Sequence, residues 1–218
     1  MATPKLTYFD GNGRADMIRF LLTDQGVSFE DIRLSREEWA KFAEDHKDKI
    51  KFGQLPILEI DDKTLAQSEA ILIYLAMKFG VHYETPEENY SYIVFMNTMN
   101  DIYKRIEVKS AGEPDPTKKT ECIKTELEGR LKLVFQSLEA FAKENKVEET
   151  GWLIGGRKST IDYVYIPFLE RTERMLNSMG FSDYVATTTP ALWKYSETHV
   201  ANFTDYFNDE KRPQRPTQ

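Results

Sequence analysis

The 218-residue chain carries 36 acidic and 29 basic side chains, for a net charge of −7, and 40% of its residues are hydrophobic. A chain of this size and composition can bury one sizeable core or two small ones. Because the acidity is evenly spread and no basic arm or patch interrupts it, we expect neither a nucleic-acid partner nor attraction to an anionic membrane surface.

The sequence also bears on the cell compartment. Its first residues lack an apolar signal core, and no apolar run approaches the roughly 20 residues that a membrane helix needs. The single cysteine, Cys122, excludes an internal disulfide framework and a cysteine-based zinc site, and it agrees with a reducing compartment. We therefore expect a cytoplasmic protein without a metal site, in which Cys122 is a half-buried core thiol on a helical stripe.

The first third of the chain alternates strand and helix signals. We expect a strand at 4–9, a helix from about residue 15 to Gly26, and a strand at 28–34. Ser35 is a typical N-cap, with glutamates in the first turn of the helix that follows and runs to the lysine-rich stretch 47–51.

Two further strands, at 55–60 and 64–66, are joined by a hairpin turn and followed by a helix from about 68 to 79. The order β-α-β-α-β-β-α is that of a thioredoxin-like domain. Gly80 can end the last helix, and Thr85-Pro86 resists a helix at Thr85. We therefore place an N-terminal domain at 1–80 and a linker at 81–86.

Beyond the linker, apolar residues recur at helical spacing, which predicts an all-α domain over 87–218 and thus an α/β plus all-α fold class. We expect one long helix through 92–106, a turn at 112–116 and a second long helix through 123–141. A third helix should begin at Ser159, with Asp162 in a capping box, and a fourth should follow Pro190. Residues 208–218 are polar and Pro-rich, and we expect an extended tail there.

The chemistry of the first domain depends on the end of its first strand. A redox Cys-x-x-Cys would stand there in many thioredoxin-like proteins, but residues 10–13 are Asp-Gly-Asn-Gly, which excludes disulfide exchange. Tyr8 ends the strand, and Arg14 opens the next helix, where free N–H groups and the helix dipole favour an anion. A phenol at this place can donate to a thiolate, although a single strand tyrosine is most often structural.

Two weaker signals accompany Tyr8. Leu55-Pro56 enters a strand, where a cis proline would turn the preceding backbone toward a ligand and a trans one would only mark an edge. Gln67-Ser68 opens a helix, where the hydroxyl and backbone N–H groups can hold a carboxylate or simply cap the helix. Each has an ordinary structural explanation, so only their combination is specific.

Taken together, these motifs closely resemble the glutathione site of sigma-class glutathione transferases. The resemblance is carried by residues 8–16 with Arg19, by Trp39, by 53–58 and 67–71, and, in the helical part, by 152–156 leading into Ser159-x-x-Asp162. It runs through nearly the whole chain and implies a cytosolic enzyme that uses glutathione as co-substrate.

The resemblance also implies the roles of single residues. Tyr8 would hydrogen-bond the glutathione sulfur and Arg14 would support the thiolate, which makes these two the catalytic pair. The other glutathione contacts that it implies are Trp39 and Lys47 at the glycyl end, the backbone of Leu55 ahead of cis Pro56, Gln67 and Ser68 on the γ-glutamyl carboxylate, and Asp101 from a partner subunit. The family's glycyl-binding lysine lies four residues after the tryptophan, where this chain has Ala43, so Lys47 is assigned by counting back from Gly53. Asp101 implies a homodimer with shared sites.

The expected reaction is conjugation of the thiolate to hydrophobic electrophiles, as in detoxification, with glutathione peroxidase activity as a possible addition. The second substrate would lie in a cleft between the domains, with candidate contacts at Phe9, Gly13, Met99, Tyr103, Val164 and Phe168. Plain helix packing explains any single one of these apolar residues equally well.

Three alternatives stay open. A prostaglandin isomerase would use the same glutathione site, but Asn97, Asn100 and Val108 replace the metal-binding aspartates and the tryptophan of the vertebrate prostaglandin D synthases. A non-catalytic, crystallin-like relative is disfavoured because the motif residues around Tyr8 and Ser68 are retained. A ligand-binding module would be separated from an enzyme by turnover with a generic electrophile.

Overall fold

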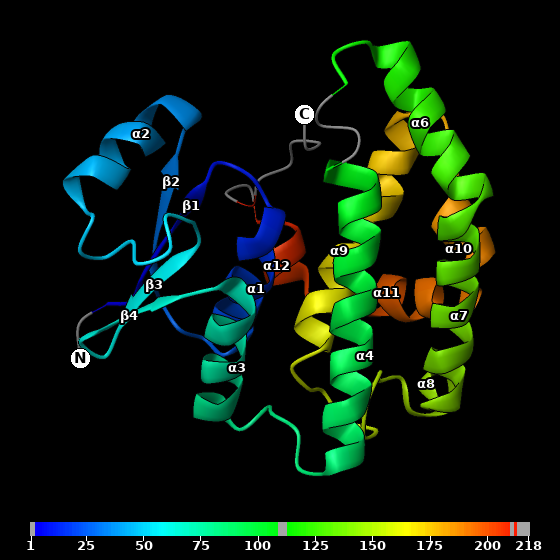
Figure 1. Ribbon diagram of the computed structural model, residues 1–218. Coiled ribbons are helices and arrows are strands. Elements are labelled where there is room, and N and C mark those ends of the chain that lie inside the picture. The colour runs from blue at the N-terminus through cyan, green and yellow to red at the C-terminus, as the bar shows by residue number, and fades with distance from the viewer. Residues whose placement is uncertain (1–2, 109–112, 210–211, 213–218) are drawn as a thin grey trace. The chain divides into compact units, whose positions relative to one another are not determined.

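The computed structural model describes residues 3–108, 113–209 and 212 and divides the chain into two compact units (Figure 1). The first unit holds residues up to His82 and the described residues from Phe203 onward, and the second holds Tyr83–Asn202. This division differs from the predicted domains in two ways: the segment from Phe203 belongs with the first unit and not with the helical one, and the predicted linker at 81–86 is divided between the units after His82.

A four-stranded sheet in the order β2-β1-β3-β4 forms the centre of the first unit. Its strands are β1 (Lys5–Phe9), β2 (Glu30–Leu34), β3 (Ile57–Ile60) and β4 (Lys63–Ala66). β1 pairs with β2 in parallel and with β3 antiparallel, and β3 pairs with β4 antiparallel. The strand pairing and the order of elements confirm the predicted thioredoxin-like fold.

Three helices and a short 3-10 turn complete this fold: η1 (Gly13–Ala15), α1 (Asp16–Asp24), α2 (Arg36–Asp45) and α3 (Ser68–Phe79). α1 and α3 pack against each other, whereas α2 lies beside β2 on the other side of the sheet (Figure 1). The predicted cap of α2 is confirmed, because the Glu38 N–H donates to Ser35 Oγ at 3.1 Å and the Ser35 N–H donates back to Glu38 Oε2 at 2.7 Å.

The last described segment adds a short helix, α12 (Thr204–Phe207), to the first unit. The fully buried ring of Phe20 on α1 contacts the rings of Phe203, Tyr206 and Phe207, with centroid distances of 4.9 to 5.4 Å. These aromatic contacts pack α12 against α1.

The second unit is all-helical, as predicted. Its elements are α4 (Pro86–Tyr103), a π-helical continuation η2 (Lys104–Val108), α6 (Pro116–Glu128), α7 (Arg130–Glu144), α8 (Val147–Thr150), α9 (Asp162–Ser178), α10 (Tyr184–Thr188) and α11 (Pro190–Asn202). Every residue from 159 to 169 is buried, so the first half of α9 lies in the core of this unit. Within the predicted turn at 112–116, residue 112 lies outside the described residues.

The prediction of one long helix through 123–141 is wrong. The segment forms two helices, α6 and α7, which meet at Gly129. The backbone of Gly129 has φ −103° and ψ −115°, and its N–H ends α6 on the Thr125 carbonyl at 3.1 Å. Leu127 and Leu131 are both buried on either side of the break. The apolar stripe therefore continues across it, and hydrophobic periodicity does not reveal the interruption.

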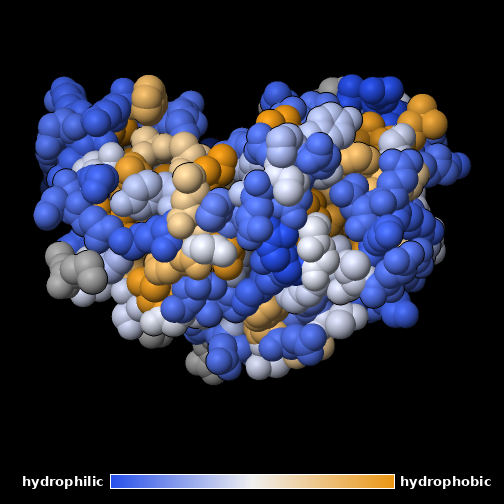
Figure 2. All heavy atoms as spheres, turned by 90° about the horizontal axis from the view of Figure 1, so that it is seen from below, coloured by the Kyte–Doolittle hydropathy of each residue, from blue (hydrophilic) through white to orange (hydrophobic). Residues whose placement is uncertain are grey.

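The surface agrees with the acidic, polar composition. Hydrophilic side chains cover most of the face shown in Figure 2, and apolar side chains stand there in separate groups. Cys122, on α6, is half-buried, as expected for a core thiol. Across the described parts of the chain, no helix combines the length and apolar character needed to cross a membrane.

Candidate functional site

The end of β1 brings Tyr8 against the turn that opens α1. Tyr8 is half-buried, and the backbone N–H of Arg14 donates to its hydroxyl oxygen at 3.1 Å. The guanidinium carbon of Arg19 lies 5.9 Å from the centroid of the Tyr8 ring. Because the phenolic oxygen accepts the bond from Arg14, its own proton is left to donate to another acceptor.

Gly13 permits this close approach of backbone and phenol. Its φ of +45° lies in the left-handed region, and a Cβ placed on it would stand 2.5 Å from the Tyr8 hydroxyl oxygen and 2.8 Å from a ring carbon. Real Cβ atoms essentially never come within 3.0 Å of another heavy atom, so a larger residue at position 13 would have to displace the Tyr8 side chain, and only glycine fits without doing so. Gly13 was predicted as a contact of the hydrophobic substrate, and the structure gives it this additional steric role.

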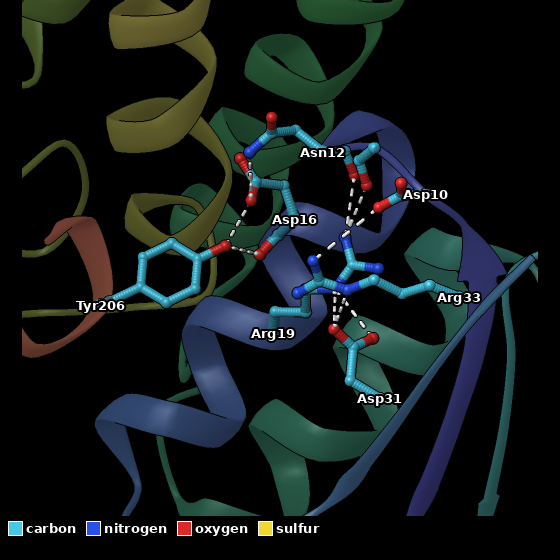
Figure 3. Close-up of polar contacts among 8 residues, drawn as sticks. Asp10, Asn12, Asp16, Arg19, Asp31, Arg33 and Tyr206 are labelled. Atoms are coloured by element: carbon cyan, nitrogen blue, oxygen red, sulfur yellow. Dashed lines mark hydrogen bonds and ion pairs between the residues drawn. The ribbon is translucent and has the colours of Figure 1, made fainter. Parts of the chain in front are cut away.

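A buried polar network holds the loop that follows Tyr8 (Figure 3). Asn12 Nδ2 donates to Asp16 Oδ1 at 3.1 Å, and the Asp16 N–H donates back to the Asn12 carbonyl at 3.1 Å. Arg19, only 2% exposed, donates from Nη1 to the Gly11 carbonyl at 2.7 Å and from Nε to Asp31 at 3.0 Å. The loop is thus tied both to α1 and to β2.

The far end of the chain supplies two further members of this network, which the sequence analysis missed. The Tyr206 hydroxyl lies within hydrogen-bonding distance of the Asp16 carboxylate and 3.0 Å from its main-chain oxygen, and Arg212 Nη2 lies 3.2 Å from Asp16 Oδ2. Arg212 is 4% exposed, so the extended tail predicted for 208–218 is wrong at this residue. The aromatic spacing of Phe203, Tyr206 and Phe207 was the available signal of a packed end.

Two other predicted elements of the site lie on the same unit. The Leu55–Pro56 peptide bond, just before β3, is cis as predicted, and Pro56 is buried. Gln67 precedes α3 with φ +68°, a rare conformation for a residue other than glycine, and its side chain does not cap the helix. Ser68, 6% exposed, is the first residue of α3, so Gln67 and not Ser68 is the N-cap.

The residues predicted for the glycyl end differ in their surroundings. Trp39 on α2 is half-buried, and its ring meets that of Phe9 edge to face at a centroid distance of 5.9 Å. Lys47 lies after α2 on the exposed surface, where its ammonium group donates to Glu44 at 2.6 Å. Lys47 is therefore engaged in a surface ion pair, which is of the kind that contributes little to stability.

The remaining predicted residues belong to the second unit. Asp101 is exposed on α4. Met99, Val164 and Phe168 are each at most 5% exposed, whereas Tyr103 is half-buried with the Arg171 guanidinium 5.7 Å from its ring centroid. In the part of the chain that is described, no group of three His, Cys, Asp or Glu side chains could hold a metal ion.

Comparisons with known proteins extend these observations. The family "Glutathione S-transferase, N-terminal domain" matches residues 4–77. The class-mu 28 kDa glutathione S-transferase isozyme of Schistosoma japonicum is 31% identical over 91% of this chain and 100% of its own length. Glutathione S-transferase 1 of Ascaris suum is 49% identical, but the match spans only 38% of this chain and 39% of that protein.

Two solved structures are similar over almost the whole chain. Prostaglandin synthase D of Nilaparvata lugens superposes with a TM-score of 0.79 at 26% identity, covering 96% of this chain and 98% of that one. A glutathione S-transferase of Necator americanus described as monomeric gives a TM-score of 0.76 at 30% identity, covering 98% of this chain and 99% of that one. The fold and the sequence therefore lead to the same set of proteins.

Proposed function

Because this chain belongs to the glutathione S-transferase family of enzymes, we propose that it binds glutathione in its thioredoxin-like unit and activates the thiol with Tyr8. The observation that carries this proposal is the 3.1 Å hydrogen bond from the Arg14 N–H to the Tyr8 hydroxyl oxygen. It orients the phenol so that its proton can be donated to a sulfur anion beside the start of α1.

The energetics of activation are within the reach of these groups. A free cysteine thiol has a pKa of about 8.5, so at neutral pH only a few per cent is thiolate. Each unit by which that pKa falls corresponds to about 1.4 kcal/mol. One phenolic donor, assisted by the cation of Arg14 and the positive end of α1, is sufficient for a shift of one to two units.

We assign the rest of glutathione to the elements around Tyr8. The γ-glutamyl carboxylate would meet Gln67 and Ser68 at the start of α3, where backbone N–H groups lack helical partners. The cysteinyl backbone would pair with Leu55 ahead of β3. Trp39 would hold the glycyl end, with Lys47 as its proposed cation once the Glu44 pair opens.

The proposed reaction is nucleophilic conjugation. The thiol proton passes to solvent, the sulfur then forms a bond to an electrophilic carbon, and a halide or equivalent group leaves, or an enolate is protonated when the acceptor is an unsaturated carbonyl. We retain Phe9 and Gly13 in the first unit and Met99, Tyr103, Val164 and Phe168 in the second as proposed contacts of the apolar substrate. Peroxidase activity would consume a hydroperoxide and two glutathiones, giving an alcohol, water and glutathione disulfide.

A glutathione-dependent prostaglandin isomerase is the second candidate. It is favoured by the structural similarity to the prostaglandin synthase of Nilaparvata lugens. Asn97 and Asn100 replace the aspartates expected for a metal-activated synthase, so we rank conjugation first.

We further propose that the protein is a cytoplasmic homodimer of the sigma class, with Asp101 of one subunit serving the glutathione ammonium in the other. The related hookworm protein is described as monomeric, so the family does not decide the oligomeric state. Mixing Tyr8→Phe with Asp101→Ala subunits gives the test, because a shared site places both defects in one site and leaves the other intact. Activity above the mean of the parents supports sharing, and no gain despite subunit exchange contradicts it.

An activity panel tests the main proposal. Purified protein with glutathione would be given an aryl halide, an unsaturated aldehyde, cumene hydroperoxide and a prostaglandin endoperoxide. We expect turnover of the first two. Turnover of the endoperoxide alone would favour the isomerase, and binding without turnover of any of the four would favour a ligand-binding protein.

A further inference from the structure

Tyr206 and Arg212, in the last described part of the chain, are anchored beside the proposed thiol site. The Tyr206 ring stacks on Phe20 at a centroid distance of 4.9 Å, and the Arg212 guanidinium carbon lies 4.6 Å from the Phe207 ring centroid and 5.2 Å from that of Tyr206. Two aromatic faces therefore hold the Arg212 side chain in place, in a buried setting where cation–π contacts are at their strongest. These ring contacts fix the positions of the Tyr206 hydroxyl and the Arg212 guanidinium beside the loop that follows Tyr8.

Both polar groups of the segment meet the same carboxylate (Figure 3 shows Tyr206). The Tyr206 hydroxyl and Arg212 Nη2 each hydrogen-bond to Asp16, whose residue is 4% exposed. Burial first, and then the adjacent Asp16 charge, raise the pKa of Tyr206 well above its ordinary value, so its hydroxyl remains a donor. Asp16 thereby receives a charge-assisted bond from each of two side chains that lie nearly 200 residues away in sequence.

Asp16 in turn fixes the turn that carries Arg14. Asn12 and Asp16 are bonded to each other twice, once between side chains and once between backbone groups. These two bonds bracket Gly13, Arg14 and Ala15, the residues of η1. We therefore expect a shift of Asp16 to move η1 and, with it, the Arg14 N–H that hydrogen-bonds the Tyr8 oxygen.

We propose that Tyr206 and Arg212 are positioning residues for thiol activation: by clamping Asp16 they hold η1 in the geometry that aims the Tyr8 hydroxyl at the glutathione sulfur. The inference rests on the proposed glutathione transferase function and adds to it a role for Tyr206 and Arg212. The proposed γ-glutamyl contacts, Gln67 and Ser68, lie at the start of α3 and not on η1, so the clamp should affect the reactivity of the thiol more than the affinity for the tripeptide.

The test uses the full chain with two substitutions, Tyr206→Phe and Arg212→Gln. The first keeps the ring that stacks on Phe20 and removes only the hydroxyl, so it retains the fold even if the second does not. In each variant the ultraviolet absorbance of the bound thiolate is titrated against pH, and kcat and KM are measured with an aryl halide. We expect the thiol pKa to rise by about half a unit, kcat to fall about five-fold and KM for glutathione to stay within about two-fold.

Tyr195→Phe is the matched control, because it removes a buried tyrosine hydroxyl that donates to a buried aspartate, Asp162, at 2.6 Å in the second unit. It should lower thermal stability by a similar amount and leave the thiol pKa unchanged. An unaltered thiol pKa and kcat in Tyr206→Phe, or an equal shift in Tyr195→Phe, would overturn the clamp. The thiol pKa of glutathione bound to Tyr8→Phe distinguishes failure of the clamp from failure of the proposed function. If that pKa equals the wild-type value, Tyr8 does not activate the thiol, and the proposed function and the clamp both fail. If it rises while the pKa in Tyr206→Phe does not, only the clamp fails.

Discussion

Each unit contains a buried tyrosine–aspartate pair, and the two pairs differ in which other groups donate hydrogen bonds to the aspartate. Tyr206 donates to Asp16, the first residue of α1, and Tyr195 donates to Asp162, the first residue of α9. Both aspartates are at most 4% exposed. Asp162 also accepts from the backbone N–H groups of Leu153 and Ser159, at 3.3 and 2.7 Å, so it organises the approach to its own helix.

Asp16, in contrast, joins segments that are remote in sequence. It accepts from Asn12 in the loop after β1 and from Arg212, nearly 200 residues further along the sequence. A tyrosine–aspartate pair therefore organises the start of a helix in the second unit, whereas in the first unit such a pair connects α12 to the loop after Tyr8. Loss of the Asp162 pair should change stability alone, while loss of the Asp16 pair should change both stability and chemistry.

The strongest test of this contrast is Tyr8→Phe, which removes the reacting hydroxyl and leaves both aspartate networks intact. We expect kcat to fall about 100-fold, because the hydroxyl stabilises the thiolate and the developing charge more than the bound thiol. Stability should change little, since Tyr8 is only half-buried. Steady-state assays with an aryl halide measure kcat, and thermal unfolding of the same preparation measures stability. An undiminished kcat would show that Tyr8 does not take part in the reaction.

The next largest effect is expected for Gly13→Ala, which displaces the Tyr8 phenol from the Arg14 N–H and removes none of the side chains of the Asp16 network. The added Cβ would stand 2.5 Å from the Tyr8 hydroxyl oxygen, at a backbone φ of +45°. The displaced phenol should cost about ten-fold in kcat, together with about 1 kcal/mol of stability. Gly11→Ala is the control, because no atom lies within 4 Å of its Cβ position. Equal losses in both variants would argue against the contact with Tyr8.

Local sequence signals predicted much of this architecture, and the reason is visible in single residues. The Ser35 cap and the start of α3 at Ser68 each depend on neighbours a few positions away, whereas the cis Pro56 followed from the family resemblance. The break at Gly129 was missed because its buried neighbours keep the helical period across it. Hydrophobic periodicity records which face is buried and not whether the backbone is continuous.

The polar network of the first unit was the harder part to predict. Asp16 and Arg19 belong to the motif that carried the family resemblance, yet no role followed from their positions alone. Arg212 stands in a polar, Pro-rich stretch, and its partner Asp16 lies at the opposite end of the sequence. No local pattern encodes a contact of such separation, so the three-dimensional arrangement was needed to find it.

A smaller effect, on stability alone, is expected for Tyr195→Phe. The substitution leaves the ring in place and deprives Asp162 of a 2.6 Å hydrogen bond, which should lower the free energy of unfolding by about 1 kcal/mol. Glutathione turnover should be unchanged under conditions where the protein is folded. Urea unfolding gives the first quantity, and a loss of turnover in the folded variant would show that the two aspartate pairs are not functionally distinct.

The smallest expected effect concerns a third hydrogen-bonded carboxylate, that of Glu88 in the capping box of α4. A 2.6 Å hydrogen bond from Arg157, first among several causes, lowers the pKa of Glu88 from 4.5 to about 2. The unfolded chain then binds the proton more readily, so the stabilisation is fully present above about pH 4.5 and is lost as the pH falls toward 2.

Because Arg157 is 37% exposed, solvent screening reduces this contribution to about 1 kcal/mol or less. We expect Glu88→Gln to flatten the acid limb of the stability curve between about pH 5 and pH 2, with little change in the thiol pKa of bound glutathione. Guanidinium unfolding at a series of pH values measures this limb in the wild type and the variant. Parallel curves of unfolding free energy against pH for the wild type and Glu88→Gln would mean that Glu88 has the same pKa in the folded and unfolded chain. The ion pair with Arg157 would then contribute nothing to the pH dependence of stability.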